Sequence, residues 1–417
     1  MFYFLLFIYI LLAISFRRNR LLLFLLALQV LSLVGAIVIN KPDYLDNPKT
    51  FFNVWVVLIL NLLVILPWKK SGHVTSLICR NEKNWRSITR ILLIISGFTF
   101  LILLVAAIVV NTQVSDVNAF KYKEGESMDF YYSMLPFDVH FFILACKLYT
   151  LSYILLPLHF YYLSVGNKRY ALLCGLFSLN IVLYGMTFFS RWTILQYAFQ
   201  YFAMWLMCSQ VLSMNLKKKL KKIMGVVAIV AGAFFISISI SRFTDNKLYE
   251  LERIPSDSPI QNPTAYSFFD YLGQNNSSGM FLLNKYDGHT FGGSYAMSEI
   301  HDLFQGLRLV GESAYDNLRV RYWGEFAGGF SGWAAYTVYD FGYILAFLTG
   351  LIYYILVSKK GSKMTLSDFI KSSFLLQIPL CAIFYSWLSV VLFCYFIYFF
   401  IWLYLSLFSS RVNKSKR

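Results

Sequence analysis

The stretch ILLIISGFTFLILLVAAIVV (Ile91–Val110) has no charged residue in 20 positions, and it decides the fold class. A bilayer hydrocarbon core about 30 Å thick needs about 20 apolar residues in a helix that crosses it. The run is continuous, whereas the strands of membrane β-barrels alternate apolar and polar residues. Similar runs recur along the chain, so the sequence predicts an all-α polytopic membrane protein.

The composition of the whole chain agrees with this class. Of 417 residues, 58% are hydrophobic and 14% are charged, and the mean hydropathy is +0.58. In a membrane protein, the net charge of +16 indicates basic cytoplasmic loops rather than a nucleic-acid partner. The six cysteines form no CxxC pair, so neither a disulfide framework nor a thiolate metal site is indicated. The first apolar run is followed at once by RRNR (Arg17–Arg20), without a small-residue cleavage site, and no cleavable signal peptide is expected.

We expect eleven transmembrane helices. Their approximate ranges are 2–16, 21–39, 51–67, 91–111, 139–164, 170–188, 193–213, 223–241, 334–357, 372–386 and 388–409. Residues 372–409 form one apolar stretch that is too long for a single helix, so we expect a break near Ser386–Trp387. The chain then divides into eight helices over 1–241, a large loop over 242–333, and three helices with a basic tail over 334–417.

The charges between the expected spans alternate regularly. The odd-numbered loops and the tail contain 24 of the 37 basic residues but only two acidic ones, Glu82 and Asp368. Basic residues concentrate in cytoplasmic loops. The pattern therefore predicts an N-terminus outside the membrane and a C-terminus in the cytoplasm. It also places the loop 242–333 on the outer side.

This large outer loop is too long for a simple connector, and its content of Tyr, Phe and Leu argues against disorder. We expect it to pack on the outer ends of the helices. Within it, Gly292–Gly311 places apolar residues at helical spacing, with His301, Gln305 and Arg308 on the other side. Two interpretations stay open. In one, the helix lies on the membrane surface and its polar face is exposed to solvent. In the other, that polar face lines a substrate cleft.

Asp340 lies at the outer end of the ninth expected span. A carboxylate inside a membrane is expected to have a partner and often has a functional role. An arginine of the outer loop is the natural partner. A structural ion pair and a catalytic carboxylate both fit this position.

Arginines recur on the predicted outer face, where the charge bias would not place them. Arg191 is the only charge in TFFSRWTILQYAF (Thr187–Phe199), a short hairpin between two apolar runs. Arginine binds phosphate through two hydrogen bonds at once. The chain has no Walker loop, dinucleotide fingerprint or HExxH motif, so a soluble nucleotide is not indicated. The remaining anion at that depth is a lipid phosphate or diphosphate. The set is Arg191, Arg242, Arg308, Arg319 and Arg321.

The layout resembles the bacterial O-antigen polymerases, which join oligosaccharide repeat units. The resemblance covers nearly the whole chain: about eleven spans, short loops, and one long outer loop late in the sequence. The segments that carry the local similarity are, in chain order, FFSRWTILQYAF (188–199), ISRF (240–243), GHTFGGSY (288–295) and AAYTVYDFGYILAFLTG (334–350).

This resemblance implies a GT-C-like, lipid-dependent glycosyltransferase in the bacterial inner membrane. Such enzymes transfer a growing glycan from undecaprenyl diphosphate onto an incoming undecaprenyl-diphosphate-linked oligosaccharide at the periplasmic face. A chain-length regulator protein is a candidate partner, and no metal or cofactor is expected. Arg191 and Arg242 are the first choices to bind the diphosphate, followed by Arg319 and Arg321, with Arg308 nearby. A general base must deprotonate the acceptor hydroxyl. The candidates are His301, Glu299, Glu325 and Asp340.

Three other classes of membrane protein are alternatives to a polymerase. A flippase for the same lipid-linked sugar is expected to show internal repeats and short loops, and neither is apparent. A membrane O-acyltransferase usually relies on an intramembrane or cytoplasmic histidine. The only cytoplasmic one here, His73, has no obvious partner. A scaffold without chemistry leaves the outer arginines unexplained.

Overall fold

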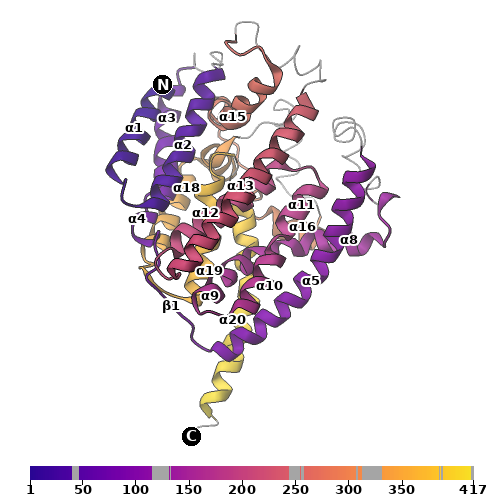
Figure 1. Cartoon of the computed structure of the whole chain (residues 1–417). Coiled ribbons are helices and arrows are strands. Elements are labelled where there is room, and N and C mark those ends of the chain that lie inside the picture. The colour runs from indigo at the N-terminus through magenta and orange to yellow at the C-terminus, as the bar shows by residue number, and fades with distance from the viewer. Residues whose placement is uncertain are drawn as a thin grey trace. The chain divides into compact units, whose positions relative to one another are not determined.

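The structure is a computed structural model. It describes residues 1–39, 47–114, 131, 133–243, 254, 258–306, 309–311, 331–384, 386 and 388–414. Apart from two strands of three residues each, the regular structure in these ranges is helical (Figure 1). The expectation of an all-helical chain is therefore confirmed for the described residues.

The described residues form two compact units, each built from separate stretches of the chain. Unit 1 comprises Met1–His73, Lys247–Ser362 and Phe374–Tyr395, and unit 2 comprises the rest. The helices of unit 1 are α1 (Phe2–Ser15), α2 (Arg20–Ile39), α3 (Thr50–Ile65), α4 (Trp68–Ser71), α15 (Pro263–Lys285), α16 (Ser298–Gly306) and α18 (Gly332–Ser358).

Unit 2 contains both strands and most of the middle of the chain. Its elements are β1 (Ser76–Ile78), α5 (Glu82–Gln113), α8 (Val139–Leu148), the 3₁₀ turn η3 (Tyr149–Leu151), α9 (Ser152–Ser164), α10 (Lys168–Ser178), α11 (Asn180–Thr187), α12 (Arg191–Cys208), α13 (Met214–Phe243) and β2 (Lys363–Thr365). The last two helices, α19 (Leu366–Cys381) and α20 (Leu388–Lys414), contribute residues to both units.

Seven helices among the described residues are long and apolar enough to cross a membrane. They are Arg20–Ile39, Thr50–Ser71, Glu82–Gln113, Val139–Ser164, Lys168–Thr187, Gly332–Ser358 and Leu388–Leu407. The other four expected spans also fall on helices, namely α1, α12, α13 and α19. The membrane class is supported, and the count of eleven spans stays a prediction.

Contacts between loops test which of them share a side of the membrane. β1 and β2 pair in parallel, with Ser76 opposite Lys363, and they belong to the third and ninth expected loops. Lys49 Nζ donates to the Tyr286 carbonyl oxygen at 3.2 Å, which joins the second and eighth loops. Odd loops thus meet odd loops and even loops meet even loops, as the charge alternation requires. Which side is cytoplasmic stays a prediction.

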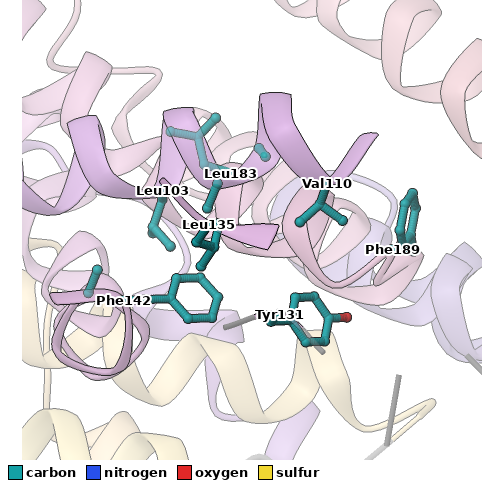
Figure 2. Packing of buried hydrophobic residues seen from close by; sticks show 10 residues of the cluster. Leu103, Val110, Tyr131, Leu135, Phe142, Leu183 and Phe189 are labelled. Carbon is teal, nitrogen blue, oxygen red and sulfur yellow. The ribbon is translucent and has the colours of Figure 1, made fainter. Parts of the chain in front are cut away.

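The core of unit 2 that surrounds Phe142 is apolar. Figure 2 shows the rings of Phe142 and Tyr131 below Leu103 and Val110 of α5 and Leu183 of α11. The Tyr131 and Phe142 rings are stacked with centroids 6.3 Å apart. Phe142 is 0% exposed. This core, which we call the Phe142 cluster, consists of Leu103, Ala106, Ala107, Val110, Tyr131, Leu135, Phe142, Ala145, Leu183 and Phe189.

Unit 1 contains a helix that the sequence analysis did not predict. α15 lies inside the expected outer loop and packs against α2, α3 and α18. It begins with Asn262 as N-cap, whose side chain accepts from the Ala265 N–H, and with Pro263 in its first turn. Both are strong helix-start signals. This part of the large loop thus packs on helices, and its place at their outer ends stays a prediction.

Glycines allow α15 to approach α2 closely. A β-carbon at Gly273 would lie 2.2 Å from the Ala36 backbone nitrogen, and one at Gly35 would lie 2.8 Å from the Gly273 nitrogen. Small residues at such crossings let two backbones approach closely, which is a common way to pack helices in membranes.

α18 is broken at Gly342, where φ is +75° and ψ is 169°. Residues 332–340 before the break are all buried, whereas Ile344 after it is 78% exposed. The ninth expected span is therefore two helical segments with different surroundings. The predicted break in the last apolar stretch is confirmed, because α19 ends at Cys381 and α20 begins at Leu388.

Candidate functional site

Some of the residues predicted from the sequence lie outside the described residues. These are Arg308, Arg319, Arg321 and Glu325. Arg242 lies in the last turn of α13, and Arg191 is the first residue of α12; both belong to unit 2. Asp340, Glu299 and His301 belong to unit 1.

Arg191 lies in the tight hairpin that the sequence predicted. α11 ends at Thr187 and α12 begins at Arg191, so three residues connect them. The turn includes Phe189 with φ of +48°, and the Ser190 N–H donates to the Gly185 carbonyl oxygen at 2.7 Å. Arg191 itself is only 8% exposed. Because Arg191 is the first residue of α12, it lies at the positive end of that helix's dipole.

Asp340 has backbone partners among the described residues. Its Oδ1 accepts from the Tyr295 N–H at 3.0 Å and its Oδ2 from the Ala296 N–H at 2.8 Å. The Gly293 N–H also donates to the Asp340 backbone oxygen at 3.1 Å. These contacts hold the turn 291–297 against α18. Asp340 thus forms a charge-assisted clamp on backbone amides, and both of its carboxylate oxygens are engaged. The expected ion pair with an arginine of the outer loop stays a prediction, because Arg308, Arg319 and Arg321 lie outside the described residues.

The clamp positions α16, which follows the turn directly. α16 is helical over Ser298–Gly306, which confirms the helix predicted from the apolar spacing in this segment. His301 is half-buried, and within the described part of the chain its Nδ1 is buried without a hydrogen-bond partner. Glu299 lies two residues earlier, in the first turn of the same helix. Asp340, Glu299 and His301 therefore belong to one local assembly.

The interior of unit 1 contains a polar network that the sequence analysis missed. The Asn53 side chain donates to Asn284 Oδ1 at 2.9 Å, and the Asn284 side chain donates to Thr50 Oγ1 at 2.8 Å. The Tyr343 hydroxyl donates to Asn53 Oδ1 at 2.9 Å. These bonds join α3, α15 and α18 at buried positions. The available signal was Asn53, a polar residue in the mostly apolar run of α3.

A second polar group lies further along α15. The Ser32 hydroxyl of α2 donates to Asn275 Oδ1, and the Asn276 amide donates back to the Ser32 oxygen at 2.8 Å. All three side chains are buried. The run QNNSS (Gln274–Ser278) is the sequence signal for this group, because five polar residues in a buried helix need partners within the protein.

A small cavity opens beside this group, within unit 1. Its free volume is about 10 Å³, which is room for about one water molecule. None of its lining residues carries a charge. They are Val57, Asn61, Asn275, Asn276, Gly279, Met280, Ser331, Gly332, Trp333, Ala334, Ala335 and Ala382. Two of them, Asn61 and Trp333, have buried polar atoms without a partner in the described structure: the Asn61 Oδ1 atom and the Trp333 Nε1 atom.

The described residues contain no group of three or more His, Cys, Asp or Glu side chains that could hold a metal ion. The α16 assembly contains one histidine, His301, and the carboxylates Glu299 and Asp340. What this assembly offers chemically is proton transfer and hydrogen bonding at the end of a clamped helix.

The chain was compared with protein-family models, with curated proteins and with solved structures, and none of them matches it. Its function is therefore inferred from its own residues and their geometry.

Proposed function

We propose that this protein polymerises oligosaccharide repeat units linked to undecaprenyl diphosphate, as a lipid-dependent glycosyltransferase of the bacterial inner membrane. It would have eleven spans in a GT-C-like arrangement, with a periplasmic N-terminus and a cytoplasmic C-terminus. The observation on which this depends is Arg191, a guanidinium only 8% exposed at the start of α12, in a hairpin with no other charge.

This location suits an anion at the membrane surface. The N-terminus of a helix attracts anions through its free N–H groups and its dipole. A guanidinium in the same turn adds a full charge and a fork of donors that matches phosphate oxygens. A diphosphate attached to a lipid brings such an anion to this depth, whereas a soluble substrate does not.

In the proposed reaction, the acceptor hydroxyl attacks the anomeric carbon of the growing glycan. The bond between that carbon and the diphosphate oxygen breaks, and the diphosphate leaves with its electron pair. Arg191 and Arg242 stabilise the charge that develops on the leaving group. The proton of the acceptor hydroxyl passes to a general base. Within unit 1, Asp340 positions α16, since both of its carboxylate oxygens already accept backbone hydrogen bonds.

The test replaces Arg191 in cells that make the polysaccharide. Arg191→Ala should lower chain extension by about 10²–10³-fold, the usual effect of losing one donor to a developing negative charge. Surface lipid would then carry single repeat units. Arg191→Lys should fail as well, because lysine lacks the two-pronged geometry. Arg86→Ala, which removes an exposed arginine paired with Glu82, is the matched control and should extend chains normally. Long chains from Arg191→Ala at normal protein level would reject the assignment.

A flippase for the same lipid-linked oligosaccharide is the second candidate, and one observation favours it. α18 is broken at Gly342, and transporters build their substrate sites from interrupted helices. Purified protein in liposomes separates the two functions. A polymerase lengthens the glycan of lipid-linked units, whereas a flippase moves those units between leaflets and leaves their glycan length unchanged.

A further inference from the structure

One exposed face of α5 changes from basic to apolar between Arg90 and Ile94. Residues three or four positions apart share a face of a helix. Arg90 is exposed, and Ile94 is 74% exposed. The exposed residues that share this face are, in order, Lys83, Arg86, Arg90, Ile94, Phe98 and Leu101. A phospholipid has the same order of chemistry, with a phosphate headgroup first and acyl chains beyond it.

α10 lies beside α5 in unit 2 (Figure 1). The Arg90 Nε atom donates to the Tyr170 hydroxyl at 2.9 Å. Further along both helices, the centroids of the Phe100 and Phe177 rings are 5.7 Å apart. Because the two contacts advance together along both chains, the helices run in the same direction and their N-terminal ends lie at the same end of the pair.

α10 repeats the order of chemistry found on α5. Lys168 and Arg169 at its start are exposed, and Leu172 and Leu176 beyond them are 71% and 40% exposed. Both helices belong to segments long and apolar enough to cross a membrane, so we expect these leucines to face acyl chains. The exposed cations and apolar residues of the two helices form what we call the α5–α10 surface: Lys83, Arg90, Lys168, Arg169, Ile94, Phe98, Leu101, Leu172 and Leu176.

The cations of the α5–α10 surface are not balanced by carboxylates of the described residues. Glu82 pairs with Arg86 at 2.7 Å, so these two charges offset each other. The ion pairs of the described residues include none of the four cations Lys83, Arg90, Lys168 and Arg169. Basic clusters beside a membrane span attract anionic lipid headgroups. The charge of this surface therefore selects an anion as its partner.

Arg90 is held in position to receive such an anion. Its Nε is bonded to Tyr170, whose ring stacks on Tyr162 with centroids 5.1 Å apart. Tyr162 is buried, and its hydroxyl lies 3.0 Å from Thr89 Oγ1 within a hydrogen bond. The Tyr170 contact leaves the two terminal amino groups of the guanidinium for a ligand, and these match two oxygens of a phosphate. A side chain held in place before binding loses less entropy when the ligand arrives.

We propose that the α5–α10 surface binds one anionic phospholipid, whose phosphate accepts from the terminal amino groups of Arg90 and whose acyl chains lie along Ile94 and Leu172. A free phosphate shares the chemistry of the headgroup, but only a lipid also covers the apolar part of the surface. The surface belongs to unit 2 and involves none of the residues assigned to the polymerase reaction, so this proposal does not rest on the proposed function.

The test measures lipid binding to the full chain in neutral detergent by native mass spectrometry. Phosphatidylglycerol, with one net negative charge, is compared with phosphatidylcholine, which has a phosphate but no net charge. The variants are Arg90→Ala and Tyr170→Phe. Lys218→Ala is the matched control, since it removes one exposed positive charge from the start of α13 in the same unit.

Phosphatidylglycerol should bind more tightly than phosphatidylcholine to the native protein. Arg90→Ala should lower its affinity about 10-fold, because the charged hydrogen bonds to the phosphate are lost. Tyr170→Phe keeps the charge and the ring but releases the guanidinium, and it should lower the affinity by a smaller factor of about 3. Lys218→Ala should leave the affinity unchanged.

Equal affinities for the two lipids, or equal losses from Arg90→Ala and Lys218→Ala, would overturn the proposal, because both results describe attraction to net charge alone. Displacement of phosphatidylglycerol by inorganic phosphate would reject a lipid in favour of a free anion. Arg90 is exposed, so Arg90→Ala should fold, and circular dichroism checks its helix content. If that variant does not fold, the lipid preference of the native protein and its resistance to phosphate decide the question.

Discussion

The interior of unit 1 around α15 and the Phe142 cluster of unit 2 are both buried, but they are held together by different forces. The Phe142 cluster consists of apolar side chains without a single hydrogen-bonding amide. Along α15, Asn53, Asn284, Asn275 and Asn276 form directional bonds between helices. The first interior is stabilised by volume and shape, and the second by matched donors and acceptors.

The difference indicates where the molecule can recognise something. In a bilayer, apolar side chains find lipid as favourable as protein, so an apolar core gains mainly from close packing. Polar groups have no such alternative and must be satisfied inside the protein. A polar interior is therefore expensive to maintain and fixes geometry tightly, which suits a region that binds a substrate. The Phe142 cluster suits a scaffold.

The largest expected effect is in the Phe142 cluster. Phe142→Ala should destabilise the protein by about 3 kcal/mol, the low end for a buried phenylalanine, because the loss is mainly one of packing. The neighbouring Phe141 is 49% exposed, and Phe141→Ala is the matched control with a much smaller effect. Unfolding by denaturant in mixed micelles measures both. Equal losses at the two positions would contradict a volume-based core.

Gly273→Ala tests the interior of unit 1 at the close backbone contact between α15 and α2. The added methyl would overlap the Ala36 nitrogen at 2.2 Å, and overpacking of this kind costs about 1–3 kcal/mol. Gly225 of α13 has no atom within 4 Å of the same added carbon. Gly225→Ala should therefore be neutral or slightly stabilising. A thermal-unfolding comparison of the two variants checks this, and a neutral Gly273→Ala would show that α15 moves freely.

Asn53→Leu tests the hydrogen bonds of unit 1 without a change of backbone. It leaves the Asn284 oxygen without its donor and the Tyr343 hydroxyl without its acceptor, which should cost about 1–2 kcal/mol. Thr112→Val, at an exposed threonine whose hydroxyl donates to the Ile108 and Val109 carbonyl oxygens of the same helix α5, is the control within unit 2. The comparison fails if the two variants lose the same stability.

The smallest expected effect concerns an exposed polar contact near the apolar cluster. Asp138 caps α8, the helix that contains Phe142: its carboxylate accepts from the His140 N–H at 2.8 Å and lies 2.7 Å from His140 Nδ1. The backbone bond, then the side-chain bond, lowers the pKa of Asp138. A lowered pKa stabilises the folded state above the unfolded value of about 3.9 and ceases to do so as pH falls through the folded value.

The native protein should therefore lose a little more thermal stability between pH 5 and a pH of about 3 than Asp138→Asn does, since asparagine keeps the cap without the titration. Unfolding temperatures across this range measure the difference. An identical pH dependence of the two proteins would show that the cap does not contribute through its charge.

Much of the helical framework follows from the sequence. Continuous apolar runs and the alternation of charged loops predicted the helices, the short hairpin before Arg191, and the break between Cys381 and Leu388. These features depend on the length of an apolar run and on local composition, and both can be read without knowledge of the partners.

Two features of unit 1 could not be predicted in the same way. α15 contains too many polar residues to resemble a buried helix, and only its hydrogen-bond partners on α2 and α3 explain its burial. The partners of Asp340 are backbone amides, which look alike at every position of a sequence. Charge complementarity is visible in a sequence, and an amide-lined turn is not. An arginine as a further partner of Asp340 stays a prediction, because Arg308, Arg319 and Arg321 lie outside the described residues.

The short parallel pair of β1 and β2 has a consequence for the order of synthesis. Ser76 can pair with Lys363 only after 287 further residues have been synthesised. At about 5–20 residues per second, the first strand waits roughly 15–60 s for its partner. During that interval its edge is open to pairing with other chains. Unit 2, although most of its helices are made early, is therefore completed only when nearly the entire chain exists.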